Sequence, residues 1–179
     1  CFEIALRNAI NSHYLGRHGE DWLRDAVRVN GFFNVNSCRK TARIIRTKYR
    51  VLRPYSHPKL VAEMDFGFWR YLFAQPQFYA AGQSLLQVFP AKPRSTPAMQ
   101  YNNRYMFNTL EMVNSLRNRI AHHEPVCFRL GGHAVIDTTY AAESYHLIQE
   151  LFRWMQIDAL DLFYGMDHVD QIIGRINNL

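Results

Sequence analysis

The sequence of 179 residues contains no apolar run long enough to cross a membrane. A membrane-spanning helix needs about 20 predominantly apolar residues, and no part of this chain resembles a signal peptide. The chain begins at Cys1 rather than Met, so a segment upstream of it is expected. These features predict a cytoplasmic protein without a membrane partner.

Cysteine is scarce, with only Cys1, Cys38 and Cys127 in the whole chain. An odd number of widely spaced cysteines matches neither a disulfide framework nor a zinc-binding pattern. Reduced thiols in a cytosolic protein are the simplest interpretation. We therefore expect no metal and no other cofactor.

Acidic residues are missing from a long stretch of the chain. Residues 1–123 hold 18 Lys and Arg against 7 Asp and Glu, whereas residues 124–179 hold 3 against 8. Between Ala26 and Ala62 there is no acid, and the bases are Arg28, Arg39, Lys40, Arg43, Arg46, Lys48, Arg50, Arg53 and Lys59. Arginine, which dominates, suits bidentate contacts with phosphate. The stretch predicts either a solvated helix face or a polyanion-binding surface, with Arg39, Lys40, Arg43, Arg46, Arg50 and also Arg104 as candidate RNA contacts.

Apolar residues make up 48% of the chain, enough for a core, and Pro and Gly separate segments with helical periodicity. The pattern predicts an all-α fold in one domain over residues 1–179. Ser37 is the expected N-cap of the basic helix. Residues 126–138, with Gly131-Gly132, are expected to form a short hairpin or a loop. Helices are expected over residues 2–15, 21–29, 37–52, 59–73, 77–88, 98–122, 139–163 and 167–177.

The helix expected over residues 98–122 divides into two faces at 100° per residue. One face carries a polar stripe: Arg104, Asn108, Glu111, Ser115, Asn118 and His122. The opposite face carries Met106, Val113, Leu116 and Ile120, which are expected to anchor the helix. A polar stripe is ordinarily the solvated side of a helix, but this one is rich in Asn, Ser and His and contains no Lys.

The stripe ends at paired histidines, His122 and His123, just before Glu124-Pro125. Adjacent histidines lack the i,i+4 spacing of a helical zinc pair, which argues against a metal site. Histidine moves protons near neutral pH, and arginine binds phosphate oxygens. Arg117, Asn118 and His122 therefore suit RNA cleavage without metal, which needs an activated 2′-hydroxyl and a stabilised phosphate.

One geometric difficulty accompanies this hypothesis. On a straight helix Arg117 and His122 lie about 140° apart. Either the helix unwinds near its end, or the long side chain of Arg117 reaches around it, or the two residues meet from two subunits across a dimer axis.

Four motifs occur in an order that resembles a known family. They are Glu3-Ile4-Ala5-Leu6-Arg7-Asn8, then Asp65-Phe66-Gly67-Phe68-Trp69 with the following Arg70-Tyr71-Leu72-Phe73, then Arg117-Asn118-Arg119-Ile120-Ala121-His122, and finally His123-Glu124-Pro125. Together they resemble the Abi-like (abortive infection) family of the HEPN superfamily. The motifs cover residues 2–125, and residues 138–179 would complete the bundle with C-terminal helices.

This resemblance implies a HEPN-like helical bundle, often a homodimer, with metal-independent ribonuclease activity. It implies that Arg117, Asn118 and His122 are catalytic, with Glu3 and Arg7 of the opening motif as supporting residues. The polar stripe and the paired histidines add Glu111, Ser115 and His123 as further supporting candidates. Glu3 and Arg7 are also spaced to pair with each other. Phe66, Phe68 and Trp69 are expected in the core rather than stacked on substrate.

Two functions are therefore predicted from the sequence. The first is a phage-defence or toxin-like endoribonuclease that cleaves tRNA or mRNA, with a cognate antitoxin as a further partner. The second is a non-catalytic helical module for RNA binding or dimerisation, because some HEPN-like domains have lost activity. No helix-turn-helix signal favours a DNA-binding repressor.

Overall fold

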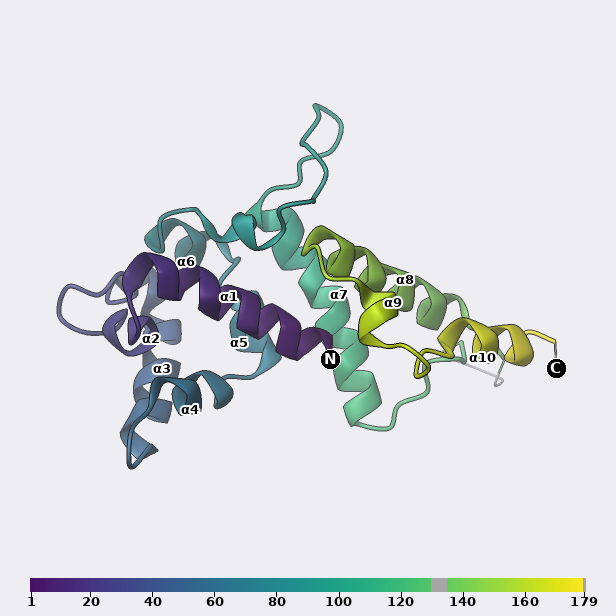
Figure 1. Cartoon of the computed structure of the whole chain (residues 1–179), viewed down its shortest axis with the longest axis horizontal. Helices are drawn as coiled ribbons and strands as arrows, with labels where there is room; N and C mark the ends of the chain where they lie inside the picture. The colour runs from purple at the N-terminus through teal and green to yellow at the C-terminus, as the bar shows by residue number, and fades with distance from the viewer. Residues whose placement is uncertain (130–134, 179) are drawn as a thin grey trace. The chain divides into compact units, whose positions relative to one another are not determined.

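A computed structural model describes residues 1–129 and 135–178 of the chain. These residues form an all-α fold, which confirms the predicted fold class, and the pairing of Phe128 with Ile136 is an isolated antiparallel bridge (Figure 1). The chain divides into two compact units. The first unit comprises Cys1–Val88 and Pro93–Asn108, and the second comprises Phe89–Lys92 and Thr109–Leu179. The prediction of a single domain stays a prediction.

Most helices belong to the first unit, and α7 contributes to both. The helices of the first unit are α1 (Phe2–His18), α2 (Trp22–Asp25), η1 (Asn36–Cys38), α3 (Arg39–Val51), α4 (His57–Ala62), α5 (Phe66–Tyr71), α6 (Gln75–Ala80) and η2 (Leu85–Val88). Helix α7 (Asn103–Ala121) follows, and the second unit continues with α8 (Thr139–Trp154), α9 (Ala159–Leu162) and α10 (Val169–Ile176).

The core of the first unit is built on one stripe of α1. Phe2, Leu6, Ile10 and Tyr14 recur every four residues, and all are buried. This spacing places the four side chains on one face of the helix. Helix α1 packs against η2 and α5. Phe66, Phe68 and Trp69 of α5 are also buried, which confirms that these aromatic residues belong to the core.

Asn11 forms a polar centre beside this core. Its Oδ1 atom accepts from Nε1 of Trp22 at 2.9 Å and lies 2.8 Å from Nε2 of His57. An indole nitrogen only donates, so the oxygen of Asn11 must face it, and Nε2 of His57 is consequently the protonated ring nitrogen. Burial lowers the pKa of His57, whose Nδ1 atom is enclosed without a hydrogen-bond partner.

Three helices predicted to be continuous are divided, namely those over residues 59–73, 77–88 and 139–163. The helix expected over residues 59–73 is interrupted at Asp65, whose carboxylate accepts from the backbone N–H of Phe68 at 2.7 Å and so caps α5. The carbonyl of Met64, freed by this break, accepts from Nε1 of buried Trp69 at 3.1 Å. The helix expected over residues 139–163 ends at Trp154, because Gln156 adopts φ 58, a left-handed conformation that terminates a helix.

Other boundaries differ by a few residues. Cys38 rather than Ser37 is the N-cap of α3, and no side-chain cap bond is formed there. Helix α7 begins at Asn103 instead of residue 98, because Oδ1 of Asn102 accepts from the backbone N–H of Tyr105 at 3.0 Å. The helix expected over residues 77–88 divides into α6 and η2 around Gly82, which has φ 83. The expected helix over residues 21–29 is only one turn long, α2.

The segment expected to form a hairpin or a loop pairs at its two described ends. Arg129 N–H donates to the Val135 carbonyl at 3.0 Å, and Asp137 N–H donates to the Cys127 carbonyl at 2.9 Å. Gly131-Gly132 lies outside the described residues. Among the helices of the described residues, none is long and apolar enough to traverse a bilayer.

Candidate active site on α7

Helix α7 presents its polar stripe to solvent. Asn118 is half-buried, and the other members are exposed: Arg104, Asn108, Glu111, Ser115 and His122. On the opposite face Met106 and Val113 are buried, as predicted. The prediction is wrong for the last turns, because Leu116 is half-buried and Ile120 is 57% exposed. The packed face of α7 therefore ends before the helix does.

The C-terminus of α7 is closed by a defined backbone motif. Glu124 N–H donates to the Arg119 carbonyl at 2.8 Å, and His123 N–H donates to the Ile120 carbonyl at 3.1 Å. These two bonds, with φ 56 at His123, form a Schellman motif in which His123 takes the left-handed position usually given to glycine. His123 therefore has a structural role as the residue that reverses the chain.

His122 is the C-cap residue, and its backbone continues the helical pattern. Its N–H donates to the Asn118 carbonyl at 2.9 Å, an i→i−4 bond. The helix does not unwind before His122, so this explanation for the separation of Arg117 and His122 is wrong. Arg117 must reach around the helix, or a second subunit must supply one of the two residues.

The side chains of the site differ in how they are held. Nη1 of Arg117 donates to Oδ1 of Asn118 at 3.3 Å, so the structure brings these two residues together. The His122 imidazole is exposed and has no hydrogen bond or ion pair with any residue in 1–129 or 135–178. The α7 site, defined as Arg117, Asn118 and His122, thus consists of an exposed cation, an amide oriented by it and an open imidazole.

Arg119 lies in the same motif but has a different role. Its side chain is 17% exposed, its guanidinium lies 4.6 Å from the centroid of the Tyr140 ring, and it donates to the carbonyl of Pro125. Its Nε atom is 3.8 Å from a carboxylate oxygen of Glu124, close enough for an ion pair but too far for a hydrogen bond. Arg119 thus fixes the chain after α7 and its contact with α8. The sequence offered only the i,i+5 spacing to Glu124 as a signal of this role.

No described contact joins the predicted supporting residues on α1, Glu3 and Arg7, to the α7 site. Nε of Arg7 donates to Oδ1 of the adjacent Asn8 at 3.5 Å, and this contact, rather than one with Glu3, is the one observed for Arg7. Glu3 lies in the first turn of α1. The supporting roles of Glu3, Arg7, Glu111 and Ser115 stay predictions.

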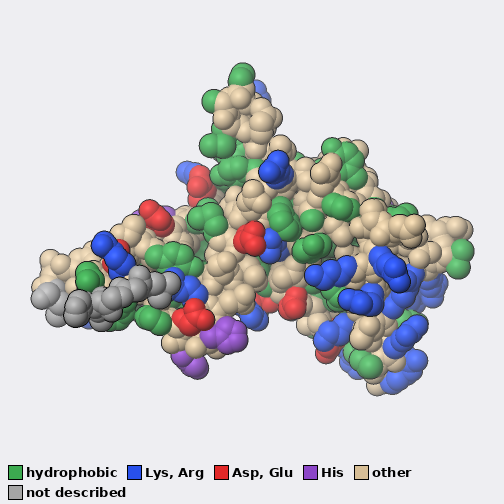
Figure 2. Space-filling model, turned by 180° about the vertical axis from the view of Figure 1, so that it is seen from behind, with side chains coloured by type: hydrophobic (Ala, Val, Ile, Leu, Met, Phe, Trp, Pro, Cys, Tyr) green, Lys and Arg blue, Asp and Glu red, His purple; other side chains and the backbone are tan. Residues whose placement is uncertain are grey.

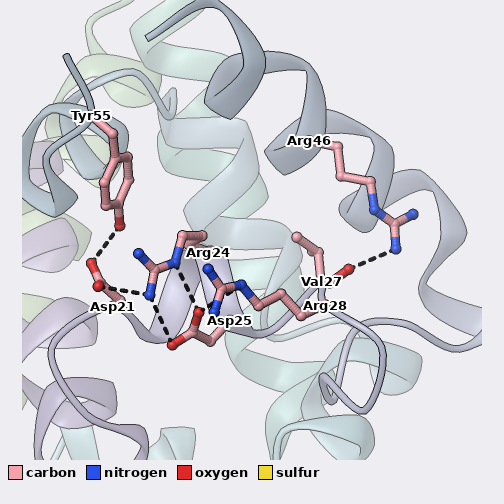
Figure 3. Close-up of polar contacts among 7 residues, drawn as sticks. All are labelled: Asp21, Arg24, Asp25, Val27, Arg28, Arg46 and Tyr55. Atoms are coloured by element: carbon pink, nitrogen blue, oxygen red, sulfur yellow. Dashed lines mark hydrogen bonds and ion pairs between the residues drawn. The ribbon is translucent and has the colours of Figure 1, made fainter. Parts of the chain in front are cut away.

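Five of the six predicted RNA contacts lie on α3, in the first unit, whereas Arg104 lies on α7. Arg39, Lys40, Arg43 and Arg50 are exposed, and together with Arg46 and Thr47 they line a shallow hollow, called here the α3 groove. Figure 2 shows Lys and Arg side chains gathered over the part of the first unit that contains α3 and α4. Arg46 is half-buried, unlike the other four. Its Nη2 atom donates to the Val27 carbonyl at 2.8 Å (Figure 3). The same atom donates to Oδ1 of Asn34 at 2.6 Å.

A metal-binding arrangement is not seen around these residues. Within residues 1–129 and 135–178, no group of three or more His, Cys, Asp or Glu side chains could hold a metal ion. The three cysteines are free, with Cys1 exposed and Cys38 buried. The described part of the chain offers proton transfer by histidine and charge stabilisation by arginine.

Comparison of the chain with protein-family models, with curated proteins and with solved structures finds no match. The site must therefore be interpreted from its own residues and geometry.

Proposed function

We propose that this protein is a metal-independent endoribonuclease of the abortive-infection type and that it cleaves RNA at the α7 site. The observation that carries the proposal is the open imidazole of His122, one turn from an Asn118 side chain that Arg117 contacts. An exposed histidine whose imidazole has no hydrogen bond or ion pair with the described residues is available for proton transfer to or from a substrate. The motif resemblance to the Abi-like family supports the same function.

The proposed reaction needs no metal. His122 accepts the proton of a ribose 2′-hydroxyl, the 2′-oxygen bonds to phosphorus, and the bond from phosphorus to the 5′-oxygen breaks. The leaving 5′-oxygen takes a proton from solvent water, so the products carry a 2′,3′-cyclic phosphate and a 5′-hydroxyl, and His122 returns its proton to solvent. Arg117 stabilises the charge on the non-bridging oxygens, and Asn118 orients the phosphate or the arginine.

A homodimer would resolve the separation of Arg117 and His122 on α7, since residues from two subunits can meet at one phosphate. We further propose a cytoplasmic location, tRNA or mRNA as the substrate, and control by a cognate antitoxin. These proposals rest on the family resemblance.

The test is cleavage of total RNA in EDTA by native protein, Arg117→Ala and His122→Ala, with Arg94→Ala as an exposed-arginine control. We expect native and Arg94→Ala proteins to cleave, and both α7-site variants to lose at least about 100-fold in rate. Activity unaffected by either α7-site variant would refute the assignment of the site.

The alternative is a non-catalytic module in which the same residues bind phosphate or hold a dimer together. It predicts salt-sensitive RNA binding without cleavage, and loss of the dimer in His122→Ala. Size-exclusion chromatography with light scattering, run alongside the cleavage assay, separates the two functions.

A further inference from the structure

The cations of the α3 groove are not neutralised by the acids around them. The groove is lined by Arg39, Lys40, Arg43, Arg46, Thr47 and Arg50 and by no acidic residue. The one ion pair described for α3 joins Lys48 to Glu63 at 3.2 Å, and Lys48 does not line the groove. Within the described residues, the groove is therefore a concentration of positive charge on a single helix.

The acids of α2, which packs against α3, are engaged elsewhere. Arg24 lies 2.8 Å from a carboxylate oxygen of Asp21 and 2.9 Å from one of Asp25, and Arg28 lies 3.3 Å from Asp25 (Figure 3). The hydroxyl of Tyr55 donates to Asp21 at 2.6 Å. Both α2 carboxylates thus compensate cations outside the groove.

One groove cation is held rigidly. The two hydrogen bonds of Arg46 to Val27 and Asn34 fix its guanidinium, and its remaining N–H groups stay available. Positions 39, 43, 46 and 50 follow one another every three or four residues, so their side chains share one face of α3. Like charges at this spacing repel, so the helix gives up stability to keep them together.

The groove offers charge but no surface for bases. None of its lining residues is aromatic. The cation–π contact described for a groove residue joins the Lys40 ammonium to the ring of Tyr71 at 5.4 Å, and the Tyr71 ring also meets Phe107 edge-on at 5.7 Å. Proteins that bind single strands combine a basic groove with rings on which bases stack. The α3 groove has only the first of these two features.

We infer that the α3 groove binds the phosphate backbone of base-paired RNA. A duplex keeps its bases stacked inside and presents its phosphates at higher charge density than a single strand, which suits a groove that contacts only phosphates. The choice of RNA over DNA rests on the proposed function. In this proposal the α3 groove binds a base-paired stem of the RNA independently of its sequence, and cleavage takes place at the α7 site.

The experiment measures fluorescence anisotropy of the full chain with a labelled RNA duplex of about 20 base pairs, long enough for a protein that spans about 16. The protein carries His122→Ala to prevent cleavage, and EDTA is present. The groove variant is Arg39→Gln with Arg43→Gln. Its control is Arg94→Gln with Arg175→Gln, two exposed arginines outside the groove whose loss changes the net charge equally.

We expect the groove variant to weaken duplex binding about tenfold or more and to reduce the salt slope by about 2, whereas the control changes the Kd less than about threefold. The groove variant should unfold at the same or a higher temperature, since it removes repulsion. Equal effects of the two variants would overturn the inference. So would tighter binding of the single strand, or tighter binding of phosphatidylserine vesicles, than of the duplex.

The two proposals fail separately. If the groove variant weakens duplex binding but the native protein cleaves no RNA, only the proposed ribonuclease activity is refuted. If the native protein cleaves RNA but the groove variant binds the duplex as tightly as the control does, only the proposed role of the α3 groove is refuted.

Discussion

Arg117 and Arg119 stand two residues apart in one helix, and the structure predicts opposite consequences of removing them. Arg119→Ala removes a charge-assisted hydrogen bond to the Pro125 carbonyl and a cation–π contact with Tyr140 at 4.6 Å. Such contacts contribute roughly 1.5–3 and 0.5–2 kcal/mol. The ion pair with Glu124 adds little, because Glu124 is 56% exposed. Since these contributions share one side chain and are not additive, we expect a loss of about 2–3 kcal/mol in the free energy of unfolding.

Arg117→Ala should cost less than Arg119→Ala, because the Arg117 side chain is exposed, whereas that of Arg119 is only 17% exposed. The same variant should abolish RNA cleavage, so stability and activity would respond to different arginines. Urea unfolding followed by circular dichroism provides both free energies at matched net charge.

A double-mutant cycle of Arg119→Ala with Tyr140→Leu isolates the cation–π contact, and its expected coupling is about 1 kcal/mol. Equal destabilisation by Arg117→Ala and Arg119→Ala would refute the division of roles. A coupling near zero would show that Tyr140 does not hold Arg119.

Three further predictions concern stability. Asn11→Ala leaves the indole N–H of Trp22 and the ring N–H of His57 without their acceptor and should cost about 2–4 kcal/mol in urea unfolding, whereas Asn11→Asp, which keeps an acceptor, should cost less. Equal losses in the two variants would contradict this account of Asn11. His123→Gly relieves the left-handed strain at φ 56 and should stabilise by about 0.5–1 kcal/mol without loss of RNA cleavage, and a destabilised or inactive variant would give His123 a role beyond the turn. Burial lowers the pKa of His57 in the folded state, so as pH falls the unfolded chain takes up its proton, near pH 6.5, before the folded chain does, and stability should fall as pH drops below about 6.5. His57→Gln should make that fall shallower, and an unchanged pH profile would exclude His57 as its cause.

The periodicity of apolar residues along the sequence predicted the all-α fold class and the helical segments. The helix predicted over residues 2–15 corresponds to α1, which extends to His18 and buries one face at Phe2, Leu6, Ile10 and Tyr14, because a buried stripe repeats with the helical period. The stripe of α7 was equally readable, and its polar members are exposed or half-buried as expected.

Helix ends were less predictable, since they depend on backbone conformations that the residue type only favours. Asp65 is a good N-cap residue, but a continuous apolar pattern around it concealed the break that its carboxylate and the Trp69 indole stabilise. Gln156 and His123 adopt left-handed conformations, which neither residue type signals as glycine would.

The sequence named Arg117, Asn118 and His122 as the candidate site, and their catalytic roles stay a prediction. It gave no sign that Arg119, two residues further on, differs from Arg117 in burial and in contacts. That distinction depends on Tyr140, which lies on α8 and is distant in sequence. The basic stretch likewise predicted the helix α3. The hydrogen bonds from Arg46 to Val27 and Asn34 could not be predicted from it, because they join residues that only the folded first unit brings together.

The most direct test of the α7 site is the chemistry of the cleaved ends. A synthetic RNA hairpin is incubated in EDTA with native protein, with His122→Ala and with His123→Gly, and the products are identified by mass spectrometry. Native protein and His123→Gly should produce 2′,3′-cyclic phosphate and 5′-hydroxyl ends, and His122→Ala should produce them at least about 100-fold more slowly. Equal rates for native protein and His122→Ala, or cleavage that requires added metal, would contradict the proposed active site.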